Sequence, residues 1–118
     1  MPTPYQKNSS YIVLHVATAD VNATVLVARP CRFTGVNHTG VAGRWIKFYD
    51  LATAPTVSDV PFMTVLTFNG SVGTMGPPSG GIWCQNGLAI RITGAAALDD
   101  ETAVSAGDVS MRSHYKLD

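Results

Sequence analysis

Alternation of apolar and polar residues is the feature that most constrains the fold of this chain. Residues 11–18 (YIVLHVAT) place Ile12, Leu14 and Val16 on one side and the residues between them on the other. The same period of two recurs in residues 109–117 (VSMRSHYKL). A period of two is that of a β-strand, and the three-to-four-residue spacing of an amphipathic helix does not recur along the chain. The sequence therefore predicts an all-β protein.

Further strands are expected between turn signals rich in Gly, Pro, Asn and Asp. They cover residues 22–29, 31–36, 44–50, 61–68, 82–85 and 87–93. Residues 11–18 and 22–29 are expected to form a hairpin, because Asp20 and Asn22 supply turn chemistry between them.

The segments between the strands are expected to be loops. Residues 37–43 (NHTGVAG) and the Gly- and Pro-rich residues 69–81 are predicted to lack regular structure. Residues 98–104 (LDDETAV) are predicted to form one helical turn, with an aspartate near its start.

Seven or eight short strands with turn signals between them indicate an antiparallel β-sandwich or barrel. The loops are long enough to cross between two sheets, which favours jelly-roll or Greek-key connections. We expect one β-sandwich domain, residues 11–118. It follows an N-terminal arm, residues 1–10, which holds two prolines and no strand pattern.

The low content of charged residues and the zero net charge limit the classes of function that the protein can have. Charged residues make up 14% of the chain, against roughly 25% in an ordinary soluble domain. A surface with so few charges is typical of a subunit packed among others, so a homo-oligomer is expected. The formal net charge is zero and the charges are scattered, which excludes nucleic-acid binding as the main role.

Membrane insertion and secretion are not expected either. No stretch approaches the roughly 20 apolar residues that span a bilayer. The N-terminal MPTPYQKNSS does not resemble a signal peptide, so we expect the protein to stay where it is made. Cys31 and Cys84 are then expected to be thiols. A disulfide between them, or across subunits, stays open as the alternative.

Metal binding and catalysis find little support in the sequence. Asp99, Asp100 and Glu101 could bind Ca²⁺ through oxygen ligands, but they lack the alternate-position pattern of a calcium loop. A solvated helix start explains them equally well. Two cysteines without spaced histidines make no zinc site. We expect no metal and no cofactor.

The histidines give no catalytic pattern. His15, His38 and His114 lie on different segments, and no sharp nucleophile turn or recognisable base accompanies them. The sequence therefore predicts a protein that is not an enzyme.

The loop that follows residues 44–50 is the best candidate for a contact surface, because it is apolar and almost without charge (LATAPTVSDVP). We expect it to pack against a neighbouring subunit or against its own sheet. The predicted interface residues are Trp45, Tyr49, Leu51, Ala54, Pro55, Val57 and Trp83. The competing interpretation is that the aromatic residues of this set form a sugar-stacking platform.

Two long segments carry a family resemblance. Residues 45–67 (WIKFYDLATAPTVSDVPFMTVLT) and 87–117 (GLAIRITGAAALDDETAVSAGDVSMRSHYKL) resemble a group of small virion proteins of tailed bacteriophages. The matching positions are Lys47 to Tyr49, Ala52 to Val57, Asp59, Pro61, Gly87 to Ile90, Gly94 to Ala96, Asp100 to Val104, Gly107 to Val109 and Tyr115.

The resemblance implies a structural subunit and no catalytic or metal-binding residue. It favours a capsid decoration (cement) protein that binds the major capsid protein or other virion subunits. Such a protein is made and assembled in the host bacterial cytoplasm and ends in the virion. A head–tail connector or tail component of the same fold is one alternative. A carbohydrate-binding module of a receptor-recognising fibre is another.

Overall fold

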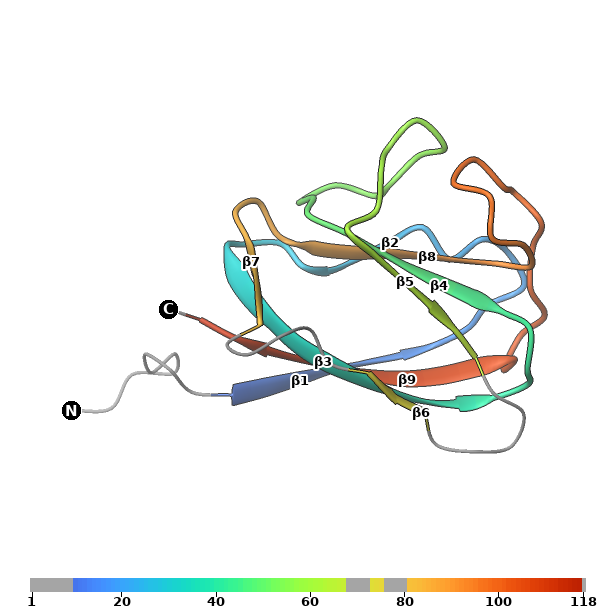
Figure 1. Cartoon of the computed structure of the whole chain (residues 1–118), viewed down its shortest axis with the longest axis horizontal. Coiled ribbons are helices and arrows are strands. Elements are labelled where there is room, and N and C mark those ends of the chain that lie inside the picture. The colour runs from blue at the N-terminus through green and yellow to red at the C-terminus, as the bar shows by residue number, and fades with distance from the viewer. Residues whose placement is uncertain (1–9, 68–72, 76–80, 118) are drawn as a thin grey trace.

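Two antiparallel β-sheets pack face to face in the computed structural model, which describes residues 10–67, 73–75 and 81–117 (Figure 1). The first, sheet A, has the order β1-β9-β3-β6, and β7 also pairs with β3. Its strands are β1 (Ser10–Val16), β9 (Val109–Lys116), β3 (Cys31–Gly40), β6 (Gly73–Met75) and β7 (Ile82–Cys84). The second, sheet B, contains β2 (Thr24–Val27), β8 (Leu88–Thr93), β4 (Trp45–Tyr49) and β5 (Met63–Leu66), in that order. The expected all-β sandwich is confirmed.

Apolar side chains from both sheets fill the space between them. Phe33 of sheet A contacts Phe48 of sheet B, with ring centroids 4.8 Å apart. Phe62, just before β5, packs on the edge of Phe33 at 5.9 Å. Ile46 and Ile90 are completely buried beside them. Packing across the two layers therefore supplies the core, as the alternation in the sequence requires.

The faces of the first and last strands follow the sequence pattern. In β9, Val109 and Met111 are buried in the core, whereas Ser110 and Arg112 are exposed. In β1, Tyr11 and Val13 pack against the core, and the ring of Tyr11 stacks on Tyr115 at 5.5 Å. The residues that alternate with these in both strands form the outer face of sheet A.

The predicted hairpin of residues 11–18 and 22–29 is wrong. β1 pairs with β9 in sheet A, and β2 pairs with β8 in sheet B. The turn chemistry is nevertheless used, because Asp20 Oδ1 accepts a hydrogen bond of 2.7 Å from Asn22 N and Asn22 adopts a φ of 53°. Asn22 Oδ1 also accepts a hydrogen bond of 2.9 Å from Thr18 N. The turn makes a corner between sheets and not a hairpin.

Two predicted loops contain strand. Residues 37–40, expected in a loop, continue β3, and the register of β3 against β9 shifts between Phe33 and Gly35. Gly73–Met75, inside the segment predicted to be irregular, pairs with residues 36–38 of β3 as β6. Pairing with β9 and β6 on its two sides keeps this part of β3 extended despite its glycines. Residues 68–72 and 76–80 lie outside the described residues.

The predicted helical turn at residues 98–104 is also wrong. The Asp100 carboxylate closes a loop instead, since its Oδ2 accepts hydrogen bonds from Ala95 N at 3.2 Å and Thr102 N at 3.1 Å. Its Oδ1 accepts a third from the Thr102 hydroxyl at 2.9 Å. An aspartate that bonds to its own neighbourhood in this way competes with a helix.

The predicted N-terminal arm lies almost wholly outside the described residues, since Ser10 already begins β1. The part of the chain that the structure describes holds no helix long and apolar enough to cross a membrane.

Candidate interaction surfaces

The outer face of sheet A carries exposed aliphatic side chains along β1, the strand at one edge of the sheet. β1 stands at the end of the sheet, and its outward residues are Ile12, Leu14 and Val16, which are 54%, 66% and 57% exposed. We call these three residues the apolar edge. The inward residues of the same strand are also largely apolar. A strand that is apolar on both faces is usual where both faces are covered, but here one of them is open.

Basic side chains lie next to the apolar edge. The outward residues of β9 are Ser110, Arg112, His114 and Lys116, and the register places Arg112 opposite Leu14. On the other side of β9, Arg32 of β3 lies opposite Lys116. We call Arg32, Arg112 and Lys116 the basic row. By the strand register, no carboxylate occurs among the described residues of this face. The face is therefore apolar at one edge and positive at its centre.

Trp83, on β7, lies on the same face next to Arg32. It lies opposite Arg32 in the β3–β7 pairing, and the Arg32 guanidinium stands 5.6 Å from the centre of the Trp83 ring. This cation–π contact holds an exposed aromatic ring next to the basic row.

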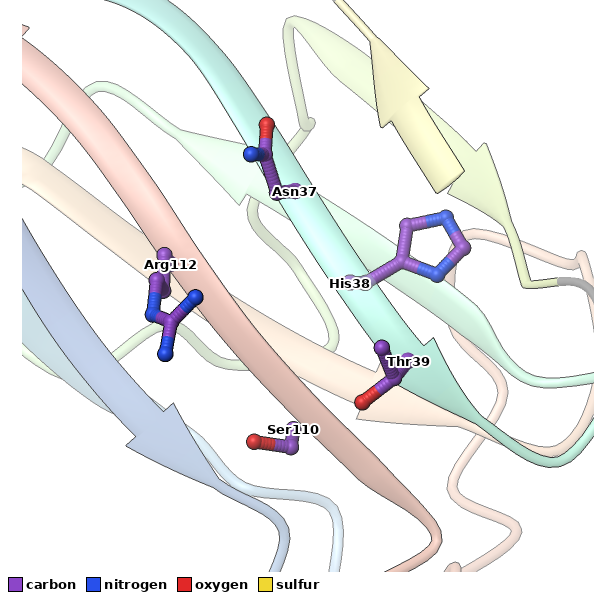
Figure 2. Close-up of a pocket in the computed structure, with 5 residues that line it drawn as sticks. All are labelled: Asn37, His38, Thr39, Ser110 and Arg112. Carbon is purple, nitrogen blue, oxygen red and sulfur yellow. The ribbon is translucent and has the colours of Figure 1, made fainter. Parts of the chain in front are cut away.

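A small recess opens beside the basic row. It has a volume of about 150 Å³ and is lined by Asn37, His38, Thr39, Ser110 and Arg112 (Figure 2). Figure 2 shows the His38 ring directed away from Arg112 and Ser110. Burial lowers the pKa of His38, which favours the neutral ring. The residues that line the recess include no carboxylate.

Two buried basic residues lie on the outer face of sheet B. Lys47 and Arg91 face each other across β4 and β8 and are 0% and 1% exposed. Lys47 Nζ donates a hydrogen bond to Ala97 O at 2.5 Å, and Arg91 donates to Leu98 O at 3.2 Å and to Asp100 O at 2.6 Å. Burial, and after it the neighbouring Arg91 charge, lowers the pKa of Lys47. These bonds fix the loop of residues 94–104 over the sheet.

The loop of residues 51–61 covers sheet B beside it, and Figure 1 shows both loops on the side of sheet B that faces away from sheet A. Asp59 Oδ2 accepts a hydrogen bond of 2.7 Å from Thr56 N, which closes a turn. Phe62 N donates to Phe48 O at 2.8 Å and returns the chain to the core. Val57 and Val60 project from this turn, 39% and 74% exposed.

The predicted interface residues are spread over the molecule. Tyr49 and Pro55 are buried inside the subunit, and Trp45 and Leu51 are half-buried. Ala54, Val57 and Trp83 are exposed. The aromatic residues do not form one platform, because Tyr49 has no exposed surface and Trp83 belongs to the other sheet from Trp45. The interface role of the exposed members stays a prediction.

The sequence did not predict that the apolar edge and the basic row lie together on one surface. The alternation in β1 and β9 identified which residues share a side of each strand. The pairing of these two strands, almost one hundred residues apart, could not be inferred from it. The available signal was β1 itself, which is largely apolar on both sides, whereas β9 has one polar side.

The two cysteines are neighbours. Cys31 lies directly opposite Cys84 in the β3–β7 pairing, and both are free, completely buried thiols. The hydrogen bond to Cys31, and after it burial, raises the pKa of the Cys84 thiol. A protonated, buried thiol is unreactive under ordinary conditions.

The remaining candidate residues stay apart. His15 Nε2 lies 2.8 Å from Asn22 Oδ1 at the corner between the sheets, and His114 is half-buried on the outer face of sheet A. Asp99 and Glu101 are exposed on the loop that Lys47 and Arg91 hold. Among residues 10–67, 73–75 and 81–117, no three His, Cys, Asp or Glu side chains gather where they could hold a metal ion.

No family model, curated protein or solved structure matches this chain.

Proposed function

We propose that this protein is a structural subunit of a bacteriophage virion, a capsid decoration (cement) protein that stabilises the head through contacts with its neighbours. The observation that carries the proposal is the apolar edge, which is more than half exposed on a strand whose other side already packs in the core. The sequence resemblance to small virion proteins and the low charge content support the same role. The role is structural and not catalytic.

The exposed side chains of the apolar edge would stabilise an assembly that covers them. Burying a Val, Leu or Ile side chain fully contributes about 1.5–3 kcal/mol relative to leaving it exposed. Ile12, Leu14 and Val16 retain more than half of their surface, so covering all three stabilises an assembly by roughly 2–5 kcal/mol before the costs of association. A free monomer gains nothing from these residues, whereas a subunit held by a neighbour does.

A single substitution on the apolar edge tests the role. Leu14→Asp places a charge where the proposal requires a neighbour, and the stability of the isolated chain should change little because the side chain is 66% exposed. We expect the variant protein to be absent from particles purified from the bacterial lysate, whereas the wild type copurifies with them. Val41→Asp is the matched control, since Val41 is also an exposed aliphatic residue but lies in the β3–β4 loop, away from the apolar edge.

Equal incorporation of both variants would overturn the assignment of the apolar edge. Absence of the wild-type chain from purified particles would overturn the virion role itself. Electron microscopy of particles carrying a label on this protein then separates decoration of the head from a place at the head–tail junction or in the tail.

A further inference from the structure

The two opposite sides of the molecule carry complementary chemistry. The loops over sheet B expose three aliphatic side chains, Val57, Val60 and Leu98, together with the carboxylates of Asp99 and Glu101. We call these five residues the loop ridge. The far side of the molecule, the outer face of sheet A, exposes the apolar edge and the basic row. One side is apolar and negative, and the other is apolar and positive.

We propose that a second copy of this chain covers the outer face of sheet A with its loop ridge. The aliphatic side chains of the ridge lie on the apolar edge, and the carboxylates of the ridge face Arg112 and its basic neighbours. The inference rests on the proposed structural role and names the neighbour in it. A second copy fits this face because the same chain supplies both complementary surfaces, on opposite sides, where one copy cannot bring them together (Figure 1).

The part of the ridge in residues 94–104, which carries Leu98, Asp99 and Glu101, is held in place before any contact forms. Lys47 and Arg91 bind three carbonyl oxygens of residues 97–100, and Asp100 closes the same loop through Ala95 and Thr102. Little conformational entropy is then lost when the ridge docks, which favours binding. The carboxylates of Asp99 and Glu101 remain exposed for a partner.

Such a contact joins two different surfaces of the subunit and therefore determines how copies assemble. A ridge that docks on a face on the other side of the molecule makes a head-to-tail contact, which leaves one free ridge and one free face at the ends. Copies therefore add to each other and form a ring or an open row. Pairing of two β1 edges would instead be symmetric and would stop at a dimer.

Two variants that each block one side test the proposal. The face-blocked variant carries Leu14→Asp and Arg112→Glu, and the ridge-blocked variant carries Leu98→Lys and Glu101→Lys. All four side chains are exposed, so both variants should fold, as circular dichroism can verify. The control is Arg29→Glu, which reverses an exposed charge in the β2–β3 connection.

The masses in solution are measured by sedimentation velocity and light scattering over a range of concentrations. We expect the wild type and Arg29→Glu to form species larger than the 12.5 kDa monomer, and each blocked variant to remain monomeric, with association weakened at least about tenfold by like charges. An equimolar mixture of the two blocked variants should form a dimer and nothing larger. In this dimer the intact ridge of the face-blocked variant binds the intact face of the ridge-blocked variant.

Three results would overturn the proposal: a wild type that stays monomeric at every concentration, a dimer that persists in either blocked variant alone, or a mixture that stays monomeric. Incorporation into particles is scored separately. If self-association fails but Leu14→Asp still abolishes incorporation, the structural role stands and the neighbour is a different virion protein.

Discussion

Oxidation of the buried cysteine pair should stabilise this protein strongly. Cys31 and Cys84 occupy directly opposite positions of an antiparallel pair, where Cα atoms lie about 4.5–5.5 Å apart. Disulfides span Cα separations of about 4.4–6.8 Å, so a bond can form without moving either strand. The two thiols lose two protons and two electrons to a small-molecule disulfide such as oxidised glutathione, which is reduced to two thiols.

The expected gain follows from the size of the loop that the bond closes. About 50 residues separate the two cysteines, and the chain-entropy relation gives about 4 kcal/mol for a loop of that length. In a domain of this size each kcal/mol raises the midpoint of thermal unfolding by roughly 3–5 °C, so the oxidised protein should melt at least about 10 °C higher.

The assay compares thermal melts of the reduced and oxidised protein by circular dichroism. Because the pair is buried and the Cys84 pKa is raised, oxidation is carried out over hours in a low concentration of denaturant. Loss of two thiols in a titration of the unfolded protein verifies the bond, and Cys84→Ala is the control that cannot form it. An oxidised protein that melts at or below the reduced one, or two thiols that survive the treatment, would refute the reasoning.

Three further substitutions test other contacts. Gly40→Ala should cost about 2 kcal/mol or more in denaturant unfolding, because φ is 144° and the added Cβ would collide with the Asp108 carbonyl oxygen; an unchanged midpoint would show that β3 and β9 can separate there freely. The hydrogen bond from Ser105 N, and after it that from Arg44, holds the pKa of Asp108 below its ordinary value of 3.8. A depressed folded pKa stabilises the protein fully above the ordinary value and loses that effect as pH falls through the folded pKa, so the advantage of the wild type over Asp108→Asn in urea should shrink as the pH is lowered below 3.8. An advantage that does not depend on pH would assign it to packing instead. Val57→Asp should reduce incorporation into particles more than it lowers the melting temperature, since the side chain is 39% exposed, and parallel losses of both would show that Val57 belongs to the subunit core.

Much of the local structure could be predicted from the sequence. The period of two identifies the strands and, in β1 and β9, the side that each residue faces, because alternation is a property of the extended backbone and needs no partner. The number of short strands and the turn residues between them were enough to predict an antiparallel β-sandwich with long loops. Asp20 and Asn22 were recognised as turn residues for the same local reason.

The pairing of strands was decided only by the tertiary structure, because it depends on residues far apart in the chain. β1 joined β9 and not its sequence neighbour β2, which brought the apolar edge and the basic row onto one face. Residues 37–40 and 73–75 became strand because β9 and β6 flank β3. Lys47 is buried because a loop fifty residues later covers it and supplies the Ala97 carbonyl oxygen to its ammonium group. The contact between Cys31 and Cys84 likewise exists only because β7 returns to β3. The local sequence determines which residues of a strand point to the same side. Which strand or loop packs against that side is determined only by the packing of the whole chain.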